Sequence, residues 1–162
     1  MSVRTGIGYD SHRFEAGRRL VLGGVEIPDA PQGLTGHSDA DALTHAVIDA
    51  LLGAAGLGDI GQRFPDTDER YRDADSLELL DDVRAAVWDR GLAVTSIDAT
   101  VVCEAPRLGP HRDRMRETLA NAVGIEAARV NVKFTTNEGM GWVGRGEGIA
   151  ALAVASVEHR AS

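Results

Sequence analysis

The chain has 162 residues, the usual size of a single domain that buries its own core without disulfides. Its formal net charge of −8 argues against a nucleic-acid-binding protein, which needs a basic surface to neutralise phosphates. The sequence contains no run of 18 apolar residues and no signal-peptide or transit-peptide pattern, so we expect an untargeted protein of the cytoplasm.

Two compositional features indicate the cellular compartment and the type of source genome. Cys103 is the single cysteine, which excludes an internal disulfide and a cysteine-based zinc cluster, and its apolar surroundings predict a buried thiol in a reducing compartment. Nearly all basic residues are arginines, and Lys133 is the one lysine among the 17. With abundant alanine and glycine, this usage is typical of a bacterial genome of high GC content.

The first half of the chain predicts strands followed by a helix. Residues 3–9 form the first expected strand, and residues 19–27 form two short extended pieces around a Gly23-Gly24 hairpin turn. Residues 38–55 carry apolar side chains at the i, i+3, i+4 spacing of an amphipathic helix. Ser38 and Asp41 resemble a capping box at its start.

The second half predicts a long loop and then alternating helices and strands. Residues 56–75 are too polar and too interrupted by Pro and Gly for a regular element, and a loop of this length is often functional. Two surface helices are expected, at residues 76–90 and from Pro110 onward, with strands at 94–103, 129–135 and 148–157. The chain therefore predicts one domain over residues 1–162, of the α/β class and α+β type, with helices packed on one face of a mixed sheet.

A metal site is suggested by Asp10, His12 and His45. In an extended chain residues i and i+2 project to the same side, so Asp10 and His12 can share one ion at the end of the first strand. His45 lies on the helix face opposite the apolar stripe and offers a third ligand. One carboxylate and two imidazoles suit Zn²⁺ and leave its fourth position open. Spacing alone leaves a second interpretation open, because Asp-x-His also arises by chance and a helical histidine is more often a surface residue.

Further polar groups stand where an anion could bind. His37 and Ser38 precede the helix that carries His45, where free N–H groups favour a phosphate, although Ser38 can equally act as a cap alone. The segment Thr135, Thr136, Asn137 and Glu138 ends a strand with hydroxyls and a carboxylate that suit Mg²⁺, or is ordinary turn chemistry.

Other patterns are rejected. Residues 139–144 match G-x-G-x-x-G, but a strand-like segment follows where a dinucleotide-binding unit needs a helix. The sequence has neither a G-x-x-x-x-G-K-[ST] phosphate loop nor a G-x-S-x-G nucleophile motif. His111 and His159 have no evident partners and are interpreted as structural or exposed.

Taken in order, five motifs resemble the 2-C-methyl-D-erythritol 2,4-cyclodiphosphate synthase family over nearly the whole chain. They are Asp10-Ser11-His12, His37-Ser38-Asp39-Ala40-Asp41 leading to His45, Leu57-Gly58-Asp59-Ile60-Gly61, Phe64-Pro65-Asp66-Thr67-Asp68 and Gly144-Arg145-Gly146-Glu147-Gly148. Any one of them is weak, whereas their ordered combination is specific. The resemblance implies an enzyme and favours the metal interpretation.

The resemblance also implies roles for individual residues. Zinc ligands would be Asp10, His12 and His45; the methylerythritol phosphate would contact His37, Ser38, Asp59, Ile60 and Gly61, in a pocket lined by Phe64, Pro65, Asp66, Thr67 and Asp68. The cytidine pocket would comprise Cys103, Glu104, Ala105, Pro106, Arg107, Leu108 and Gly109, and the diphosphate with Mg²⁺ or Mn²⁺ would lie at Thr135, Thr136 and Glu138. Arg145 would lie beside the phosphates or a central cavity. The family forms homotrimers with active sites between subunits.

Three positions depart from the family pattern. Arg107 stands where lysine is usual, Asn137 where a third threonine is common, and Trp142 where phenylalanine is common. These departures put the details of nucleotide contact in doubt and leave the implied reaction unchanged.

The implied reaction is attack by the substrate's own 2-phosphate on its diphosphate, which expels CMP. A phosphate dianion needs no general base, so charge neutralisation and orientation suffice, with His37 and Thr136 stabilising the pentavalent phosphorus. Two alternatives stay open: a metal-dependent phosphohydrolase using the same ligands, and a non-catalytic trimer that binds nucleotide or isoprenoid diphosphate. Neither a nucleic acid nor a membrane is an expected partner.

Overall fold

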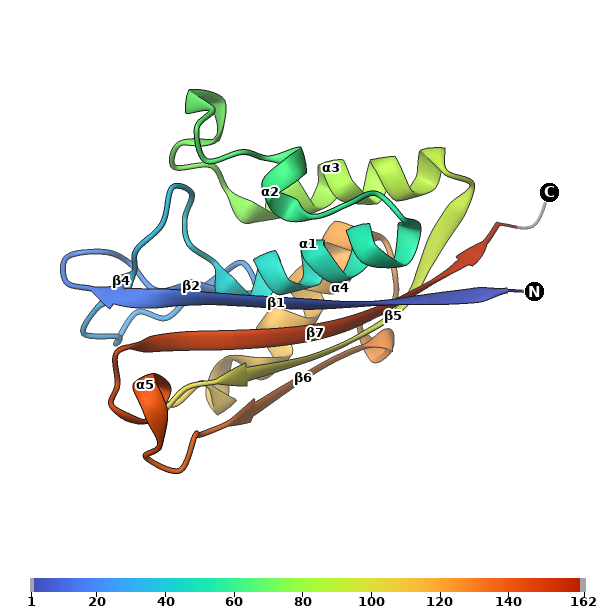
Figure 1. Cartoon of the computed structure of the whole chain (residues 1–162). Helices are drawn as coiled ribbons and strands as arrows, with labels where there is room; N and C mark the ends of the chain where they lie inside the picture. The colour runs from blue at the N-terminus through green and yellow to red at the C-terminus, as the bar shows by residue number, and fades with distance from the viewer. Residues whose placement is uncertain (1, 161–162) are drawn as a thin grey trace.

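The structure, a computed structural model, describes residues 2–160 and consists of one five-stranded mixed sheet with helices on one side (Figure 1). The strand order is β4-β1-β7-β5-β6, in which only β5 and β6 pair in parallel. The strands of the sheet are β1 (Val3–Glu15), β4 (Gly33–Leu34), β5 (Leu92–Val102), β6 (Val130–Thr135) and β7 (Gly148–His159). A separate hairpin contains β2 (Val21–Leu22) and β3 (Val25–Glu26). The predicted mixed sheet with helices is confirmed.

The helical layer contains three long helices and several short turns. The long helices are α1 (Ala42–Ala55), α3 (Ser76–Asp89) and α4 (Arg112–Val123). The short ones are α2 (Ile60–Arg63), α5 (Gly141–Gly144) and the 3₁₀ turns η1 (Glu69–Tyr71), η2 (Gly109–His111) and η3 (Ala127–Arg129). No helix within residues 2–160 combines the length and apolar character that a membrane span requires.

Helix α1 lies directly on β1 because two glycines of the strand leave room for its backbone. A β-carbon at Gly6 would collide with the carbonyl oxygen of Ala50, and one at Gly8 with that of Ala46. Glycine is therefore required at these two positions for the close approach of helix and strand. This contact sets the distance between the side chains of β1 and those of α1.

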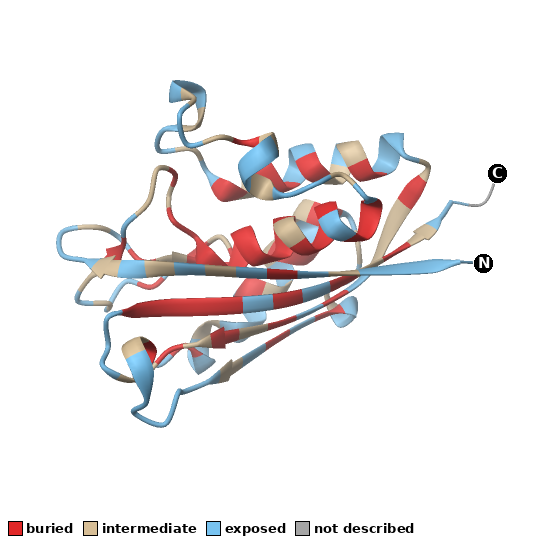
Figure 2. Cartoon of the chain, viewed as in Figure 1, coloured by how far each residue is buried: buried red, intermediate tan, exposed pale blue. Residues whose placement is uncertain are grey.

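Helix α1 is buried on almost every side, which corrects the amphipathic helix expected from its apolar stripe. The helix α3 covers its outer side, so only Asp49 and Gly53 are not fully buried (Figure 2). His45 is 8% exposed and belongs to the buried set, although the pattern placed it opposite the core. The expected one-sided burial is confirmed for α3 and α4, whose outer faces are exposed.

The predicted element boundaries need four corrections. The first strand continues past Tyr9 to Glu15, because β7 pairs with it as far as Arg13. The helix expected from Ser38 begins at Ala42, and the loop of residues 56–75 contains the short helices α2 and η1. The helix expected from Pro110 begins with the η2 turn and then continues as α4.

Asp41 joins the β2–β3 hairpin to the start of α1. Its fully buried carboxylate accepts the backbone N–H groups of Gly23 and Gly24 at 2.8 and 2.7 Å. The same carboxylate accepts the N–H of Thr44 at 2.9 Å and its hydroxyl at 2.7 Å, so Asp41 is the N-cap of α1. Burial and the nearby Asp39 raise the pKa of Asp41, and these hydrogen bonds oppose that change. The capping box predicted around Ser38 is therefore wrong.

Candidate active site

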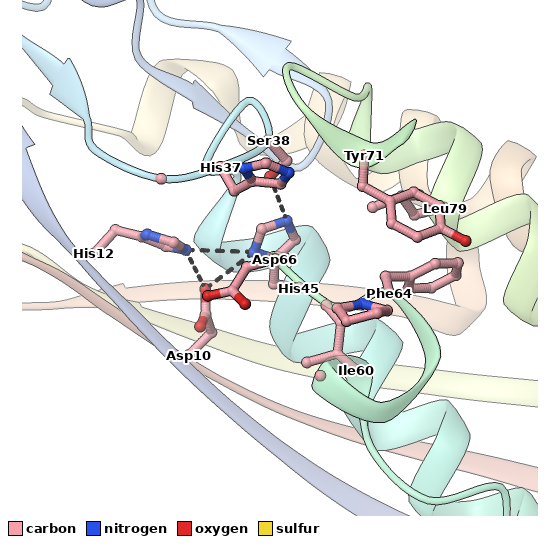
Figure 3. A pocket seen from close by; sticks show the side chains of 13 residues that line it. Asp10, His12, His37, Ser38, His45, Ile60, Phe64, Asp66, Tyr71 and Leu79 are labelled. Carbon is pink, nitrogen blue, oxygen red and sulfur yellow. Dashed lines mark hydrogen bonds and ion pairs between the residues drawn. The ribbon is translucent and has the colours of Figure 1, made fainter. Parts of the chain in front are cut away.

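Asp10, His12 and His45 converge at one point between β1 and α1 (Figure 3). The Oδ2 atom of Asp10 lies 2.8 Å from Nε2 of His12 and 3.3 Å from Nδ1 of His45, and the two nitrogens are 3.3 Å apart. Asp10 and His12 project to the same side of β1, as the two-residue period requires. His45 reaches them from the first turn of α1.

The three facing atoms fit a metal ion. His12 Nδ1 donates a hydrogen bond to the carbonyl oxygen of Thr35 at 2.7 Å. In the neutral ring Nε2 is therefore unprotonated, and its lone pair is free to bind a metal. Asp10 Oδ2 is buried and has no hydrogen-bond partner in the described part of the chain. Two ligand atoms about 2.05 Å from a tetrahedral ion lie roughly 3.3 Å apart, close to the separations found here. A carboxylate and two imidazoles suit zinc.

Asp10 and His12 also perturb each other without an ion. Burial alone would raise the pKa of Asp10, but its close contacts with the His12 and His45 rings and their charge attraction outweigh burial and lower that pKa. Burial would likewise lower the pKa of His12, whereas the contact with Asp10 raises it. Asp10 therefore favours positive charge at Nε2 of His12, on the side where a cation would lie.

A pocket of about 480 Å³ opens beside the three side chains. One wall is formed by the loop that precedes α1, and the opposite wall by α2, the loop after it and α3 (Figure 3). The lining residues are Asp10, His12, Gly36, His37, Ser38, His45, Ile60, Gly61, Phe64, Pro65, Asp66, Tyr71 and Leu79. The pocket thus combines a candidate cation site with polar loops and an apolar wall, the combination that small-molecule sites commonly show.

Comparison with known proteins gives a consistent result. The model of the YgbB family matches residues 3–158. The chain belongs to the YgbB family. A protein of Rubrobacter xylanophilus named 2-C-methyl-D-erythritol 2,4-cyclodiphosphate synthase is 60% identical over 96% of this chain and 95% of its own length. One of the same name from Syntrophomonas wolfei is 56% identical over 97% and 99%.

Solved structures agree with this family fold. The bifunctional IspDF of Campylobacter jejuni superposes with a TM-score of 0.94 at 40% identity, over 98% of this chain and 43% of that protein. A CDP-bound 2C-methyl-D-erythritol-2,4-cyclodiphosphate synthase superposes with a TM-score of 0.87 at 40% identity, over 96% of this chain and all of that one. The resemblance inferred from the ordered motifs is confirmed.

This YgbB-family chain has a second pocket, of about 550 Å³, at the ends of β5 and β6. It is lined by Cys103, Glu104, Pro106, Arg107, Leu108, Gly109, Pro110, Arg112, Phe134, Thr135 and Thr136. Arg112 lies over the ring of Phe134, with its guanidinium carbon 5.2 Å from the ring centre. A planar cation on an aromatic ring and a threonine pair form a surface on which a base and a phosphate can both bind.

Cys103, predicted to be buried, lies 8% exposed at the edge of this second pocket. Its thiol donates to the carbonyl oxygen of Ala105 at 2.8 Å. Burial raises the pKa of the Cys103 thiol to about 11. The thiol is therefore a neutral wall group and not a nucleophile.

Not every predicted site residue lies in a pocket of the single chain. Outside both linings are Asp59, Thr67, Asp68, Ala105, Asn137, Glu138, Trp142 and Arg145. Asp59 and Asp68 act as N-caps of α2 and η1, while Glu104 accepts the N–H of Asn137 at 2.7 Å. Arg145 pairs with Glu147 at 2.6 Å. The roles predicted for these residues remain predictions.

Several pocket residues were not predicted. They are Gly36, Tyr71 and Leu79 in the first pocket and Pro110, Arg112 and Phe134 in the second. Tyr71 stacks edge-on against Phe64, with ring centres 5.2 Å apart. For Tyr71 the available signal was an aromatic side chain in an otherwise polar loop, although Phe64 and Tyr71 also pack against the hydrophobic core.

The loop before α1 differs from the expected phosphate cradle at a helix N-terminus. His37 and Ser38 precede Ala42, and Asp41 already caps the helix. The Ser38 hydroxyl accepts the N–H of Ala40 at 3.2 Å and contacts Nε2 of His45 at 3.2 Å. Both residues still line the pocket, so the interpretation as a helix-terminus cradle is wrong and their placement beside the substrate region is retained.

Proposed function

We propose that the protein converts 4-diphosphocytidyl-2-C-methyl-D-erythritol 2-phosphate into 2-C-methyl-D-erythritol 2,4-cyclodiphosphate and CMP. It is a lyase of isoprenoid precursor biosynthesis. The observation that best supports this proposal is the convergence of Asp10, His12 and His45 on one point in a chain of this family. The solved relative in its CDP-bound form supports a cytidine diphosphate substrate.

The two pockets divide the substrate between them in this proposal. The first would hold the methylerythritol phosphate, next to His37, Ser38 and the segment from Asp59 to Asp68. The second would hold the cytidine, along the segment from Cys103 to Gly109. The apolar wall of the first pocket, which includes Ile60, Phe64 and Leu79, supports a methyl-bearing carbon chain there. The ring of Phe134 in the second supports a stacked pyrimidine.

The proposed reaction transfers one phosphorus between two oxygens. An oxygen of the 2-phosphate forms a bond to the β-phosphorus, the bond from that phosphorus to the bridging oxygen breaks, and CMP leaves with the bridging oxygen. Water is neither consumed nor released, and no side chain takes a proton. Asp10, His12 and His45 would hold zinc and Glu138 would hold Mg²⁺ or Mn²⁺, which would supply positive charge to the phosphates. A dication about 4 Å from one phosphate charge is worth roughly 8 kcal/mol at an effective dielectric near 20.

The protein's own residues would orient the phosphates and balance their charge. His37 lies in the pocket wall with Nε2 donating to the carbonyl oxygen of Asp68 at 3.2 Å, which holds its ring in one orientation. Thr136 lines the second pocket at the end of β6. We assign these two residues to stabilising the charge on the pentavalent phosphorus, with Thr135 and Arg145 near the diphosphate.

The active site is proposed to form between subunits of a homotrimer. Within one chain β7 and β5 separate β1 from β6, so these two strands, which carry parts of the two pockets, lie roughly 14 Å apart at ordinary strand spacing. The side of the sheet away from the helices exposes Ile7, Tyr9, Leu152 and Val154, which are 39–69% exposed. An apolar sheet face of this kind supports contact with further copies of the chain. Such contact would bring the first pocket of one copy to the second of another.

The decisive test is incubation of the zinc-loaded protein with the CDP-linked substrate and Mg²⁺, followed by phosphorus NMR. The proposal predicts CMP and a cyclic diphosphate in equal amounts. A linear monophosphate or inorganic phosphate would instead identify a phosphohydrolase, and tight CDP binding without CMP release would identify a binding protein. A matched His45→Ala protein should release no CMP.

A further inference from the structure

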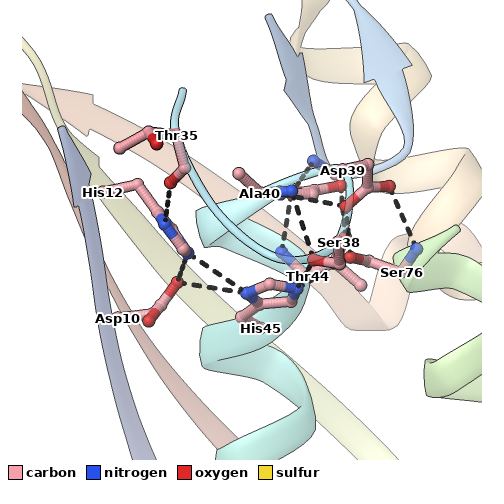
Figure 4. A network of polar contacts seen from close by, with 11 residues as sticks. Asp10, His12, Thr35, Ser38, Asp39, Ala40, Thr44, His45 and Ser76 are labelled. Carbon is pink, nitrogen blue, oxygen red and sulfur yellow. Dashed lines mark hydrogen bonds and ion pairs between the residues drawn. The ribbon is translucent and has the colours of Figure 1, made fainter. Parts of the chain in front are cut away.

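A row of buried and half-buried polar groups runs from His45 away from the candidate metal site toward the start of α3 (Figure 4). His45 Nε2 lies 2.8 Å from the hydroxyl oxygen of Ser76, and that hydroxyl in turn donates to Oδ1 of Asp39 in a short hydrogen bond. Ser76 is 0% exposed and His45 is 8% exposed. Bulk water therefore has little access to the contact between Ser76 and His45, whereas Asp39 is half-buried.

The carboxylate of Asp39 accepts every hydrogen bond it makes. Its Oδ1 accepts the N–H of Asp41 at 3.1 Å, and its Oδ2 accepts the N–H of Ser76 at 3.0 Å. Each of these donors is a backbone N–H that cannot reverse its role. The single hydrogen of the Ser76 hydroxyl must therefore point to Asp39, because two oxygens at so short a separation would otherwise repel each other.

The direction of this row determines the protonation of the His45 ring. Since the Ser76 hydroxyl has given its hydrogen to Asp39, its oxygen can only accept, and Nε2 of His45 must carry a hydrogen. The other nitrogen, Nδ1, is then unprotonated in the neutral ring, and it is the atom that faces Asp10 and His12 at 3.3 Å. The opposite tautomer would aim a hydrogen at the metal position and leave Ser76 and His45 with two facing lone pairs.

We propose that Asp39 and Ser76 are positioning residues that make Nδ1 of His45 the metal-binding nitrogen. The inference rests on the metal site of the proposed function and extends it to two residues that do not line the pocket. Partners of this kind typically change metal affinity about 10–100-fold when they are removed. Ser38 contacts the same nitrogen at the longer distance of 3.2 Å and shares its hydrogen without setting its direction.

The first measurement needs no variant. In the zinc-free protein, at a pH well above the ordinary imidazole pKa of about 6.5, long-range proton–nitrogen NMR reports which ring nitrogen of His45 carries the hydrogen. The proposal predicts Nε2. In Ser76→Ala the ring loses its nearer buried acceptor and keeps only the longer contact with Ser38. The signal should therefore move toward the Nδ1-protonated tautomer, and zinc affinity measured by chelator competition should fall about 10–100-fold.

Asp75→Ala is the matched control for loosening of α3. Asp75 is the N-cap of that helix and accepts the N–H of Leu77 at 2.9 Å. This variant weakens the same helix end and leaves the Asp39–Ser76–His45 row intact. It should lower the melting temperature and retain both the wild-type tautomer and the wild-type zinc affinity.

The outcomes separate the positioning role from the proposed function. A wild-type chain that binds zinc but carries the hydrogen on Nδ1 when zinc-free would overturn the positioning role alone. Unchanged zinc affinity in Ser76→Ala, or an equal loss in Asp75→Ala, would overturn it as well. A wild-type chain that does not bind zinc would contradict both this inference and the proposed function.

Discussion

Replacing Gly8 by alanine is expected to push α1 away from β1 and so to open the metal site. A β-carbon at Gly8 would collide with the carbonyl oxygen of Ala46 and would lie 2.8 Å from the backbone nitrogen of Ala50, where ordinary contact begins near 3.4 Å. The helix must therefore retreat by at least about 0.6 Å, and overpacking of this kind costs about 1–3 kcal/mol. For a chain of this length the melting temperature should fall by roughly 2–12 °C.

The same displacement should weaken zinc binding. Asp10 and His12 belong to β1 and His45 to α1, so any retreat of the helix lengthens the 3.3 Å separations across the site. A distortion of about 1.4 kcal/mol in the zinc-bound state corresponds to a tenfold loss of affinity. Thermal unfolding of the zinc-free protein and chelator competition on the zinc-loaded protein measure the two effects separately.

Gly53→Ala is the control at the same helix–strand interface. A β-carbon there would lie 3.8 Å from Cα of Gly6 and 4.0 Å from the carbonyl oxygen of Ile7, which are ordinary contacts. Alanine inside a helix is favoured over glycine by about 0.5–1 kcal/mol, so this variant should be more stable and bind zinc normally. A Gly8→Ala protein with wild-type stability and zinc affinity would refute the close-approach argument.

Three further predictions concern single groups. Because the pKa of Cys103 is raised to about 11, iodoacetamide at pH 8 should modify it at least about tenfold more slowly than free cysteine, and equal rates would contradict its burial. Asp41→Asn should lower the free energy of unfolding in urea by about 2–3 kcal/mol, since an amide nitrogen would face backbone N–H donors of the Gly23-Gly24 turn; an unchanged midpoint would contradict this. In the zinc-free protein the raised pKa of His12 stabilises the fold below the ordinary value of 6.5, and this stability is lost as the pH rises through the folded-state pKa. The lowered pKa of Asp10 stabilises the fold above 3.8, and that stability is lost as the pH falls through the folded-state pKa of Asp10. Unfolding free energies of wild type and His12→Gln between pH 3 and 9 test this, and parallel profiles would contradict it.

The pairing of Asp10 with His12 could be predicted from the sequence because it depends on local periodicity, whereas the family resemblance was needed to favour His45 as the third ligand. Two-residue alternation places Asp10 and His12 on the same side of the strand wherever that strand ends. The predicted strand was too short, but this error did not change the expected pairing of the two side chains. The surroundings of His45 could not be predicted in the same way. Its burial depends on α3, which covers α1 from a distant part of the chain.

Hydrogen-bond partners were the least predictable feature. Serine is a common N-cap residue, but Asp41 and not Ser38 caps α1. The carboxylate of Asp41 also accepts the backbone N–H groups of the Gly23-Gly24 turn. The contact of Ser76 with His45 joins residues 31 positions apart, and no rule of local sequence spacing predicts it. Tertiary contacts of this kind override the local capping preference.

We propose that Asp10, His12 and His45 bind one zinc ion. Anomalous diffraction at the zinc absorption edge from crystals of the zinc-loaded protein tests it most directly. The structure predicts a single strong peak per chain within bonding distance of Asp10 Oδ2, His12 Nε2 and His45 Nδ1. A map without a peak among these atoms, or with zinc bound elsewhere while they stay empty, would contradict the account.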